Sequence, residues 1–218
     1  MVGCKKETPY KEVDGWTILF DGSGYEHWRG FQNIEVPKEW TIEDGAMAYT
    51  PSNQGGKTIV SKKQYTNFIL SLEWKISKGG NSGIFWGVSN DEKYSVAYQT
   101  GLEVQVRDNE IAKDTLVLPK HRAGAIFDII APAKDVAKPI GEWNTCQIHV
   151  DYKANAAKVT MNNVLILDFP LEGPGWEQLV SQSKFRDWEG FGEYKTGFIG
   201  LQDHGNNVWY RNIKIKEL

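Results

Sequence analysis

Apolar and polar residues alternate along much of this chain, and the alternation predicts β-strands. Residues 67–76 are the clearest case, because the even positions are Phe, Leu, Leu, Trp and Ile while the odd positions are mostly polar. A period of two is typical of a strand that buries one face. Further segments with a strand pattern are 84–88, 101–107, 146–152, 157–161, 164–169, 197–203 and 208–216.

Turn signals separate these segments, and only one segment has helical spacing. Residues 153–155 and Asn162-Asn163 predict hairpin turns. Residues 176–184 predict a short helix. Since no linker or repeat interrupts the pattern, we expect one all-β domain over residues 14–218, a β-sandwich or jelly roll, preceded by an N-terminal tether over residues 1–13.

Composition narrows the class of protein. The 218 residues are 40% hydrophobic and 24% charged, which excludes a membrane-spanning or disordered chain. The formal net charge is −3, without the basic excess that a nucleic-acid binder shows. Nine Trp, nine Tyr and nine Phe suit a protein that binds sugars, but a large β core uses the same residues. Composition alone leaves both interpretations open.

The two cysteines lie in different contexts. Cys146 alternates with polar residues and is expected to be buried. Cys4 follows a glycine, and Gly-Cys resembles the end of a bacterial lipoprotein cleavage site. We therefore expect Cys4 to carry lipid as the only membrane attachment, in the periplasm or at the outer membrane, with the signal peptide absent from this chain. The alternative is a cytosolic protein in which Gly-Cys occurs by chance.

A polar strip on the segment 101–107 is the first candidate for chemistry. Glu103, Gln105 and Arg107 share one face of this strand, because strand side chains alternate, and the valines between them face the core. An ordinary solvent face is the alternative interpretation. The flanking residues, Asp108 among them, lack the Lys, Glu and Thr mixture of a solvated face, and we therefore predict a ligand cleft.

Two further polar segments lie near predicted strand ends. Asn81 stands among three glycines, which allow close approach of the backbone, and it would hydrogen-bond a sugar or fix a neighbouring loop. Gln202 and His204 share a face where the segment 197–203 ends, and His121 lies in a loop rich in cations. Loops and strand ends carry function more often than the middle of a strand.

Several classes of active site lack their motifs. No HxH or HExxH spacing supports a classical zinc site, and no GxSxG motif supports a nucleophile elbow. A conventional glycosidase needs two carboxylates. Two residues after Glu103 the chain has Gln105, an amide, so this strand does not predict such a pair.

A set of short motifs occurs in a characteristic order along residues 14–218. The motifs are Gly15–Gly22 with Trp28, Trp40–Gly45, Tyr65–Phe68, Glu73–Lys75, Gly80–Ile84, Gly101–Val106, Asp108-Asn109, Gly141–Asn144, Gly200–Gly205 and Arg211–Ile213. As an ordered set they resemble the 3-keto-disaccharide hydrolase domain family, long described as a domain of unknown function. The resemblance implies a concanavalin A-like jelly-roll β-sandwich, secreted or lipid-anchored in bacteria, that acts on oxidised sugars.

A glycoside oxidised at C3 has an acidic C2 proton. A base removes this proton, the group at C1 leaves by β-elimination, and water then adds, which requires one base, donors or a metal at the enolate oxygen, and an acid. The predicted catalytic residues are Glu103, His121 and His204, with Glu103 or His121 as the base. The predicted substrate-binding residues are Asn81, Trp86, Gln105, Arg107, Asp108, Trp188 and Gln202, with Trp86 or Trp188 stacked on the sugar ring.

The sequence requires no cofactor, although Glu103, Asp108 or His204 could hold a divalent metal that stabilises an enolate. The expected partner is an oligosaccharide or an oxidised glycoside. The first alternative is a lectin-like carbohydrate-binding module without catalysis, since one fold supports many functions. The second is a scaffold lipoprotein whose polar strip contacts another protein. We favour the enzyme over both.

Overall fold

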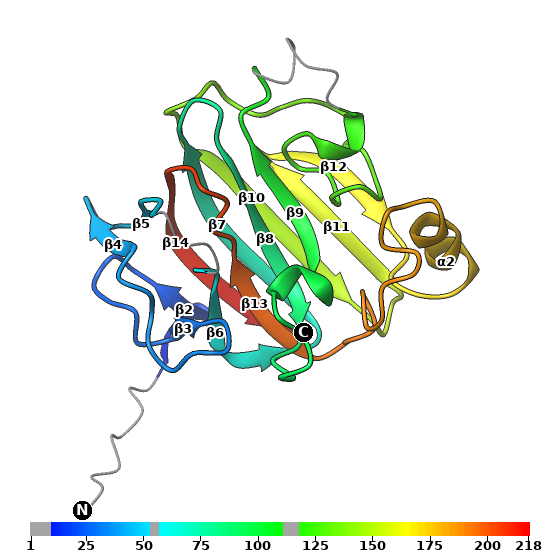
Figure 1. Cartoon of the computed structure of the whole chain (residues 1–218), viewed down its shortest axis with the longest axis horizontal. Coiled ribbons are helices and arrows are strands. Elements are labelled where there is room, and N and C mark those ends of the chain that lie inside the picture. Colours follow the sequence, from blue (N-terminus) through cyan, green and yellow to red (C-terminus); the bar gives the residue numbers. More distant parts are fainter. Residues whose placement is uncertain (1–9, 53–56, 111–117) are drawn as a thin grey trace, which may run out of the picture.

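The computed structural model describes residues 10–52, 57–110 and 118–218, and Cys4 lies outside them. Two antiparallel sheets pack face to face as a β-sandwich (Figure 1). The described residues form a nine-stranded sheet in the order β1-β2-β14-β7-β10-β11-β12, with β5 paired to β14 and β4 to β5. Its strands are β1 (Lys11–Val13), β2 (Trp16–Phe20), β4 (Trp40–Glu43), β5 (Ala46–Tyr49), β7 (Phe68–Ile76), β10 (Asn144–Asp151), β11 (Ala156–Met161), β12 (Val164–Phe169) and β14 (Val208–Glu217).

The second sheet has five described strands in the order β3-β6-β13-β8-β9. They are β3 (Trp28–Gly30), β6 (Ile59–Tyr65), β8 (Asn81–Val88), β9 (Leu102–Arg107) and β13 (Gly197–Leu201). One α-helix, α2 (Pro174–Ser181), lies beside the sandwich (Figure 1), and the 3₁₀ turns are η1 (Ala97–Gln99) and η2 (Pro119–His121). The predicted all-β sandwich is confirmed. Among the described residues we find no helix with the length and apolar character needed to cross a bilayer.

The period of two in the sequence sets the burial of the central strands. Every second residue of β7 is buried, from Phe68 to Ile76, and faces the other sheet. Trp86 is 1% exposed and belongs to the same core as Ile84, between the sheets. The prediction that Trp86 stacks on a sugar is therefore wrong, because Trp86 faces the sandwich interior rather than the solvent side.

Several element boundaries differ from the predicted ones. β8 begins at Asn81, three residues before the predicted strand segment 84–88. The helix covers Pro174–Ser181 instead of residues 176–184. Lys11–Val13 pairs with β2, so these residues of the expected tether belong to the sheet.

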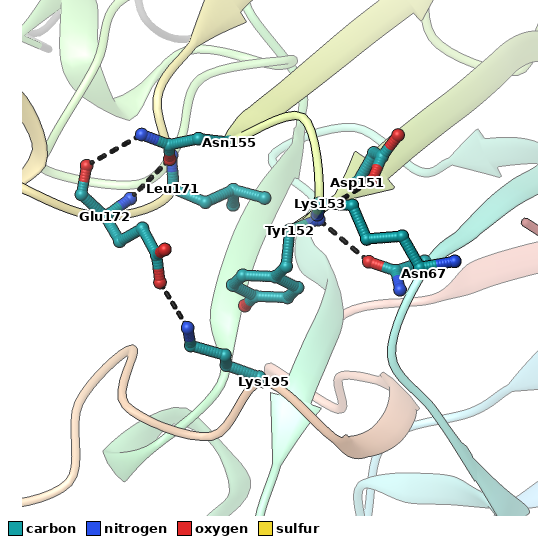
Figure 2. Close-up of polar contacts among 8 residues, drawn as sticks. All are labelled: Asn67, Asp151, Tyr152, Lys153, Asn155, Leu171, Glu172 and Lys195. Carbon is teal, nitrogen blue, oxygen red and sulfur yellow. Dashed lines mark hydrogen bonds and ion pairs between the residues drawn. The ribbon is translucent and has the colours of Figure 1, made fainter.

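The segment 171–195 is fixed at both of its ends (Figure 2). Asn155 lies in the turn between β10 and β11, and its Oδ1 accepts hydrogen bonds from the backbone N–H groups of Leu171 and Glu172, both at 2.9 Å. The carboxylate of Glu172 forms an ion pair with Lys195 at the far end of the segment. These contacts hold a long stretch, which consists of α2 and an irregular segment after it, against the sandwich.

Candidate functional site

A cavity of about 290 Å³ lies on the face of the five-stranded sheet that points away from the nine-stranded sheet. On β9, Val104 and Val106 pack in the core between the sheets, so Glu103 and Gln105 face the cavity. A cavity thus lies on the strand where the sequence predicts a ligand cleft, and its occupancy by a ligand stays a prediction. Its described lining residues are Asn81, Tyr98, Glu103, Gln105, Phe127, Lys184, Phe185, Trp188, Gln202 and His204.

Glu103 occupies space that a glycine leaves open. Its side chain is 7% exposed and lies over Gly83 on the neighbouring strand β8. A Cβ atom at Gly83 would come within 2.3 Å of Glu103 Oε1 and within 2.7 Å of Cδ. Gly83 thus makes room for the carboxyl group in the floor of the cavity.

Burial raises the pKa of Glu103 to about 8, because water no longer solvates the charged form, while the positive charge of Lys184 acts in the opposite direction. The Lys184 ammonium lies over the rings of Phe127 at 4.3 Å and Phe185 at 4.9 Å from the ring centres. A carboxyl group with such a pKa exchanges its proton near neutral pH. It is therefore suited to general acid–base chemistry.

Three amide side chains, those of Asn81, Gln105 and Gln202, line the same cavity as the carboxyl group. Gln105 Nε2 donates a hydrogen bond to Asn81 Oδ1, which links β9 to β8 across the cavity floor. Gln202 is 6% exposed, and its Oε1 has no hydrogen-bond partner among the described residues. An unpaired buried acceptor carries a free-energy cost that a bound hydroxyl group would relieve.

Aromatic rings form the open side of the cavity. Trp188 is 36% exposed and Tyr98 is 41% exposed, and their ring centres lie 6.1 Å apart. Phe185 is buried, stacked on Phe191 at 3.9 Å and edge-on to Trp188 at 5.1 Å. The exposed ring of Trp188 is therefore held in place by the aromatic cluster beneath it. Such rings with a few polar groups are typical of small-molecule sites.

His121 does not line the cavity. Its Nε2 lies 2.7 Å from Asp128 Oδ1, and its ring packs 4.7 Å from the ring of Phe127, which does line the cavity. The other oxygen of Asp128 accepts the backbone N–H of Lys184 at 2.7 Å. Through its two carboxylate oxygens, Asp128 therefore connects His121 to the segment that carries Lys184.

Two further predicted residues also lie outside the cavity lining. Asp108 Oδ2 accepts the backbone N–H of Gly79 at 2.8 Å, and its Oδ1 accepts that of Glu110 at 2.9 Å. The buried carboxylate thereby fixes the turns at the ends of β8 and β9. Arg107 is half-buried on β9 beyond Gln105, and it is not among the residues that line the cavity.

The predicted metal ligands are not assembled as a set. Glu103 and His204 line the cavity, whereas both carboxylate oxygens of Asp108 accept hydrogen bonds from backbone N–H groups. Within the part of the chain that the structure describes, no group of three or more His, Cys, Asp or Glu side chains could hold a metal ion.

Sequence reasoning missed Lys184, Phe127 and Phe185. Lys184 was expected to be the last residue of a helix, and Phe127 lies in a stretch without periodicity. Both reach the cavity through irregular segments whose place depends on contacts far along the chain, such as the bond between Asp128 and the Lys184 backbone. No local signal identifies such residues.

A larger cavity of about 530 Å³ adjoins the first one. Tyr98, Gln202 and His204 line both cavities and form the border between them. Asp203, also in the lining of the larger cavity, accepts hydrogen bonds from the Lys57 backbone N–H at 2.8 Å and the Thr58 hydroxyl at 2.7 Å. The two cavities together form one extended site at the end of β13.

The sequence is similar to known carbohydrate-active proteins. A family described as the 3-keto-alpha-glucoside-1,2-lyase-like domain matches residues 15–216. A curated protein from Bacteroides thetaiotaomicron, named 3-keto-disaccharide hydrolase, is 36% identical over 233 residues, which cover 95% of this chain and 80% of that protein.

Solved structures share the fold. One is described as a candidate glycosyl hydrolase from Parabacteroides distasonis, with 28% identity and a TM-score of 0.85 over 94% of each chain. Another is a Bacillus subtilis protein of unknown function with a galectin-like fold, with 16% identity and a TM-score of 0.58, covering 96% of this chain and 98% of the other. The second likeness concerns the fold alone.

Proposed function

Because the chain belongs to the 3-keto-alpha-glucoside-1,2-lyase-like domain family, we propose that it cleaves 3-keto-glycosides by removing the C2 proton and expelling the group at C1. The chain is a glycoside hydrolase-like enzyme that acts on carbohydrate. The proposal concerns the finer question of how the bond breaks and which residues break it.

One observation carries this mechanism: among the described residues that line the smaller cavity, Glu103 is the single carboxyl group. Classical glycosidases place two carboxylates around the scissile bond, one as acid and one as nucleophile or base. An elimination needs only one strong base, because the ketone at C3 already makes the C2 proton acidic. The adjoining larger cavity adds the carboxylate of Asp203, but its two oxygens already accept hydrogen bonds from Lys57 and Thr58. The lining of the smaller cavity therefore favours elimination over direct displacement.

Glu103 takes the role of base in this scheme. Its carboxylate accepts the C2 proton, and the electrons of the C2–H bond form a double bond between C2 and C3 with negative charge on the C3 oxygen. Lys184 and the amides of Gln105 and Asn81 stabilise that charge, since they are the cation and the hydrogen-bond donors that line the cavity beside Glu103. Trp188 packs against the sugar ring.

The leaving group then departs with the electrons of the C1–O bond. His204, at the border of the two cavities, gives the leaving oxygen a proton. Water adds to C1 of the resulting enone and returns a proton to His204, while Glu103 returns its proton to C2. The sum of these steps is hydrolysis, and both side chains end in their starting protonation states.

The test uses 3-keto-glucosides that carry deuterium at C2, with unoxidised glucosides as controls. Elimination predicts that release of the C1 group slows several-fold with deuterium and that unoxidised glucosides are not cleaved. The product loses label to the extent that the Glu103 carboxyl group exchanges its deuterium with water before it returns a proton to C2. Equal rates with full retention of label would show direct displacement and overturn the mechanism. A parallel assay with EDTA measures whether a divalent metal takes part.

A lectin-like module is the competing function, and the same experiment separates it. Sugar binding in a calorimeter without turnover of any 3-keto-glucoside would support the module. The match to the 3-keto-alpha-glucoside-1,2-lyase-like domain family and to a curated 3-keto-disaccharide hydrolase is why we place the enzyme first.

A further inference from the structure

We infer that Asp128 is a positioning residue, which holds the Lys184 ammonium in the cavity of the Glu103 carboxyl group. One oxygen of its carboxylate fixes the backbone of Lys184, and the other is held by His121. The inference rests on the proposed function, in which Glu103 is the base and Lys184 stabilises the enolate. It gives a role to Asp128 and His121, neither of which lines the cavity.

Asp128 is bonded through its backbone and through both carboxylate oxygens. Its N–H donates to the carbonyl oxygen of Lys120 at 3.0 Å. Its Oδ2 accepts the backbone N–H of Lys184 at 2.7 Å, and its Oδ1 lies 2.7 Å from Nε2 of His121. The side chain is 17% exposed, and hydrogen bonds to a carboxylate in such a place are stronger than in water. Asp128 therefore holds the segment after α2 against the loop 120–128.

The backbone of Asp128 has a conformation that few residues adopt. Its φ is +61°, in the left-handed region that glycine adopts readily and other residues adopt at a cost in free energy. Such a conformation persists where the surrounding contacts hold it. A glycine would fit this backbone at a lower cost, but it has no carboxylate to accept the Lys184 N–H. The contribution of residue 128 to the site is therefore its side chain.

The loop that carries Asp128 is also attached to the strand that carries the base. The Phe127 N–H donates to the carbonyl oxygen of Glu103 at 3.0 Å. The centre of the Phe127 ring lies 4.7 Å from that of His121 and 4.3 Å from the Lys184 ammonium. Residues 127 and 128 thus connect the base to the cation. Without the Asp128 contact, the ammonium could move away from the carboxyl group.

A displaced ammonium would change the pKa of the base. The titratable groups near Glu103 are Tyr98, Lys184 and His204 in the cavity lining and Tyr210 on β14. Burial raises the pKa of Glu103 to about 8, and the charge of Lys184 acts in the opposite direction. Loss of the fixed ammonium should therefore raise this pKa further, so that Glu103 ionises only at higher pH.

Two substitutions separate the contacts of Asp128 from its charge. Asp128→Gly suits the backbone conformation and removes both side-chain contacts. Asp128→Asn removes the same charge but keeps an amide oxygen for the Lys184 N–H and an amide NH₂ group for a neutral His121. We expect Asp128→Gly to raise the Glu103 pKa by about half a pH unit or more and to lower kcat/KM on a 3-keto-glucoside roughly tenfold or more. In Asp128→Asn both values should stay close to those of the wild type.

The pKa is read from the ¹³C chemical shift of the Glu103 carboxyl carbon during a pH titration of the folded protein. Asp44→Gly is the matched control, because Asp44 also has a positive φ, of +49°, and lies in an exposed turn between β4 and β5. Equal losses in Asp128→Gly and Asp128→Asn would show that the charge acts and would overturn the inference. A lower melting temperature of Asp128→Gly with an unmoved Glu103 pKa would show a merely structural role and would also overturn it.

His121→Ala replaces Asp128→Gly if that variant does not fold. It releases one carboxylate oxygen of Asp128, so a smaller rise of the Glu103 pKa is expected, and an unmoved pKa would refute the inference. The titration needs no substrate. If the wild-type protein cleaves no 3-keto-glucoside, the proposed function fails, while the titration still decides whether Asp128 positions Lys184.

Discussion

Glu103 is a buried acid, and its burial has a cost that depends on pH. The pKa in the folded protein is about 8, far above the ordinary value that the unfolded chain retains. Between these two values the folded state holds a proton that the unfolded state has released. Raising the pH through this window therefore lowers the free energy of unfolding, and above about 8 the loss is complete.

Replacing Glu103 by Gln removes the base and this cost together. We expect activity on 3-keto-glucosides to fall roughly 10²- to 10⁴-fold. At pH 9 the variant is expected to be more stable than the wild type by on the order of 4 kcal/mol, and near pH 4 the two should be similar. Activity assays and denaturant unfolding at both pH values check this. Glu12→Gln, an exposed site on β1, is the control, and retained activity in Glu103→Gln would remove the residue from the mechanism.

Lys184 is predicted to set the pH dependence of the reaction. The base must be ionised, so the rising limb of the wild-type kcat/KM profile should follow the Glu103 pKa of about 8. The charge of Lys184 lowers that pKa, so Lys184→Met is expected to move the rising limb to higher pH and to reduce the maximum rate. Rate profiles from pH 5 to about 10 measure both effects. The exposed control Lys216→Met should leave the profile in place, and an unmoved profile in Lys184→Met would refute the coupling.

At the scale of elements, the pairing of β8 with β9 places the carboxyl group over Gly83. In Gly83→Ala the new Cβ would come within 2.3 Å of Glu103 Oε1 and within 2.7 Å of its Cδ and Cγ, so the whole side chain must turn to another rotamer while the strands stay paired. We expect activity to fall roughly a hundredfold with little change in melting temperature. Gly175→Ala in α2 is the matched control. A large loss of stability in Gly83→Ala would contradict this account.

The turn at Asn155 is expected to control the order of the segment 171–195. Asn155 has a φ of +49°, which glycine adopts readily, so Asn155→Gly keeps the turn and removes the side-chain hydrogen bonds to residues 171 and 172. Hydrogen exchange in the segment should accelerate and KM should rise, while β7 and β10 stay protected. Asn163→Gly, with a φ of +65°, is the control. Unchanged hydrogen exchange would show that the packed aromatic rings around Phe185, rather than the turn at Asn155, hold the segment in place.

The strands could be predicted from the sequence, but the irregular segments could not. Alternation alone located β7 and β9 and assigned Glu103 to the face opposite Val104. The same rule places Trp86 on the side of Ile84, so the prediction that Trp86 stacks on the sugar ring was wrong. Lys184 lies beyond the end of the helix that was predicted to include it, and its position depends on Asp128, which is 56 residues away in sequence.

At the scale of the whole molecule, one tryptophan packs in the core between the sheets and another lines the candidate binding cavity. Trp86 is buried between the sheets, whereas Trp188 is 36% exposed in the cavity wall. We expect Trp86→Phe to cost about 1–3 kcal/mol of stability and to leave the activity of folded protein intact. Trp188→Ala should raise KM without a comparable loss. Chemical unfolding and kinetics on both variants check this, and the reverse pattern would contradict the assignment.

The site is a property of the complete sandwich. Its lining residues include Asn81, Glu103, Phe127, Lys184 and His204, which lie far apart in the sequence. The sequence motifs identified Asn81, Glu103 and His204 as candidates, but the assembly of these residues depends on strand pairing between segments far apart in sequence. Their grouping in one cavity therefore required the structure.

The ion pair between Glu172 and Lys195 brings the two ends of one long stretch together. No strand of either described sheet lies between these ends, so the stretch can change in length without any strand losing its partner, provided that the core positions of Trp176, Phe185 and Phe191 stay filled. It also supplies Lys184, Phe185 and Trp188 to the cavity. We expect related enzymes to acquire new substrates mainly by exchanging this one stretch, in the way that antibodies vary their loops on a constant frame.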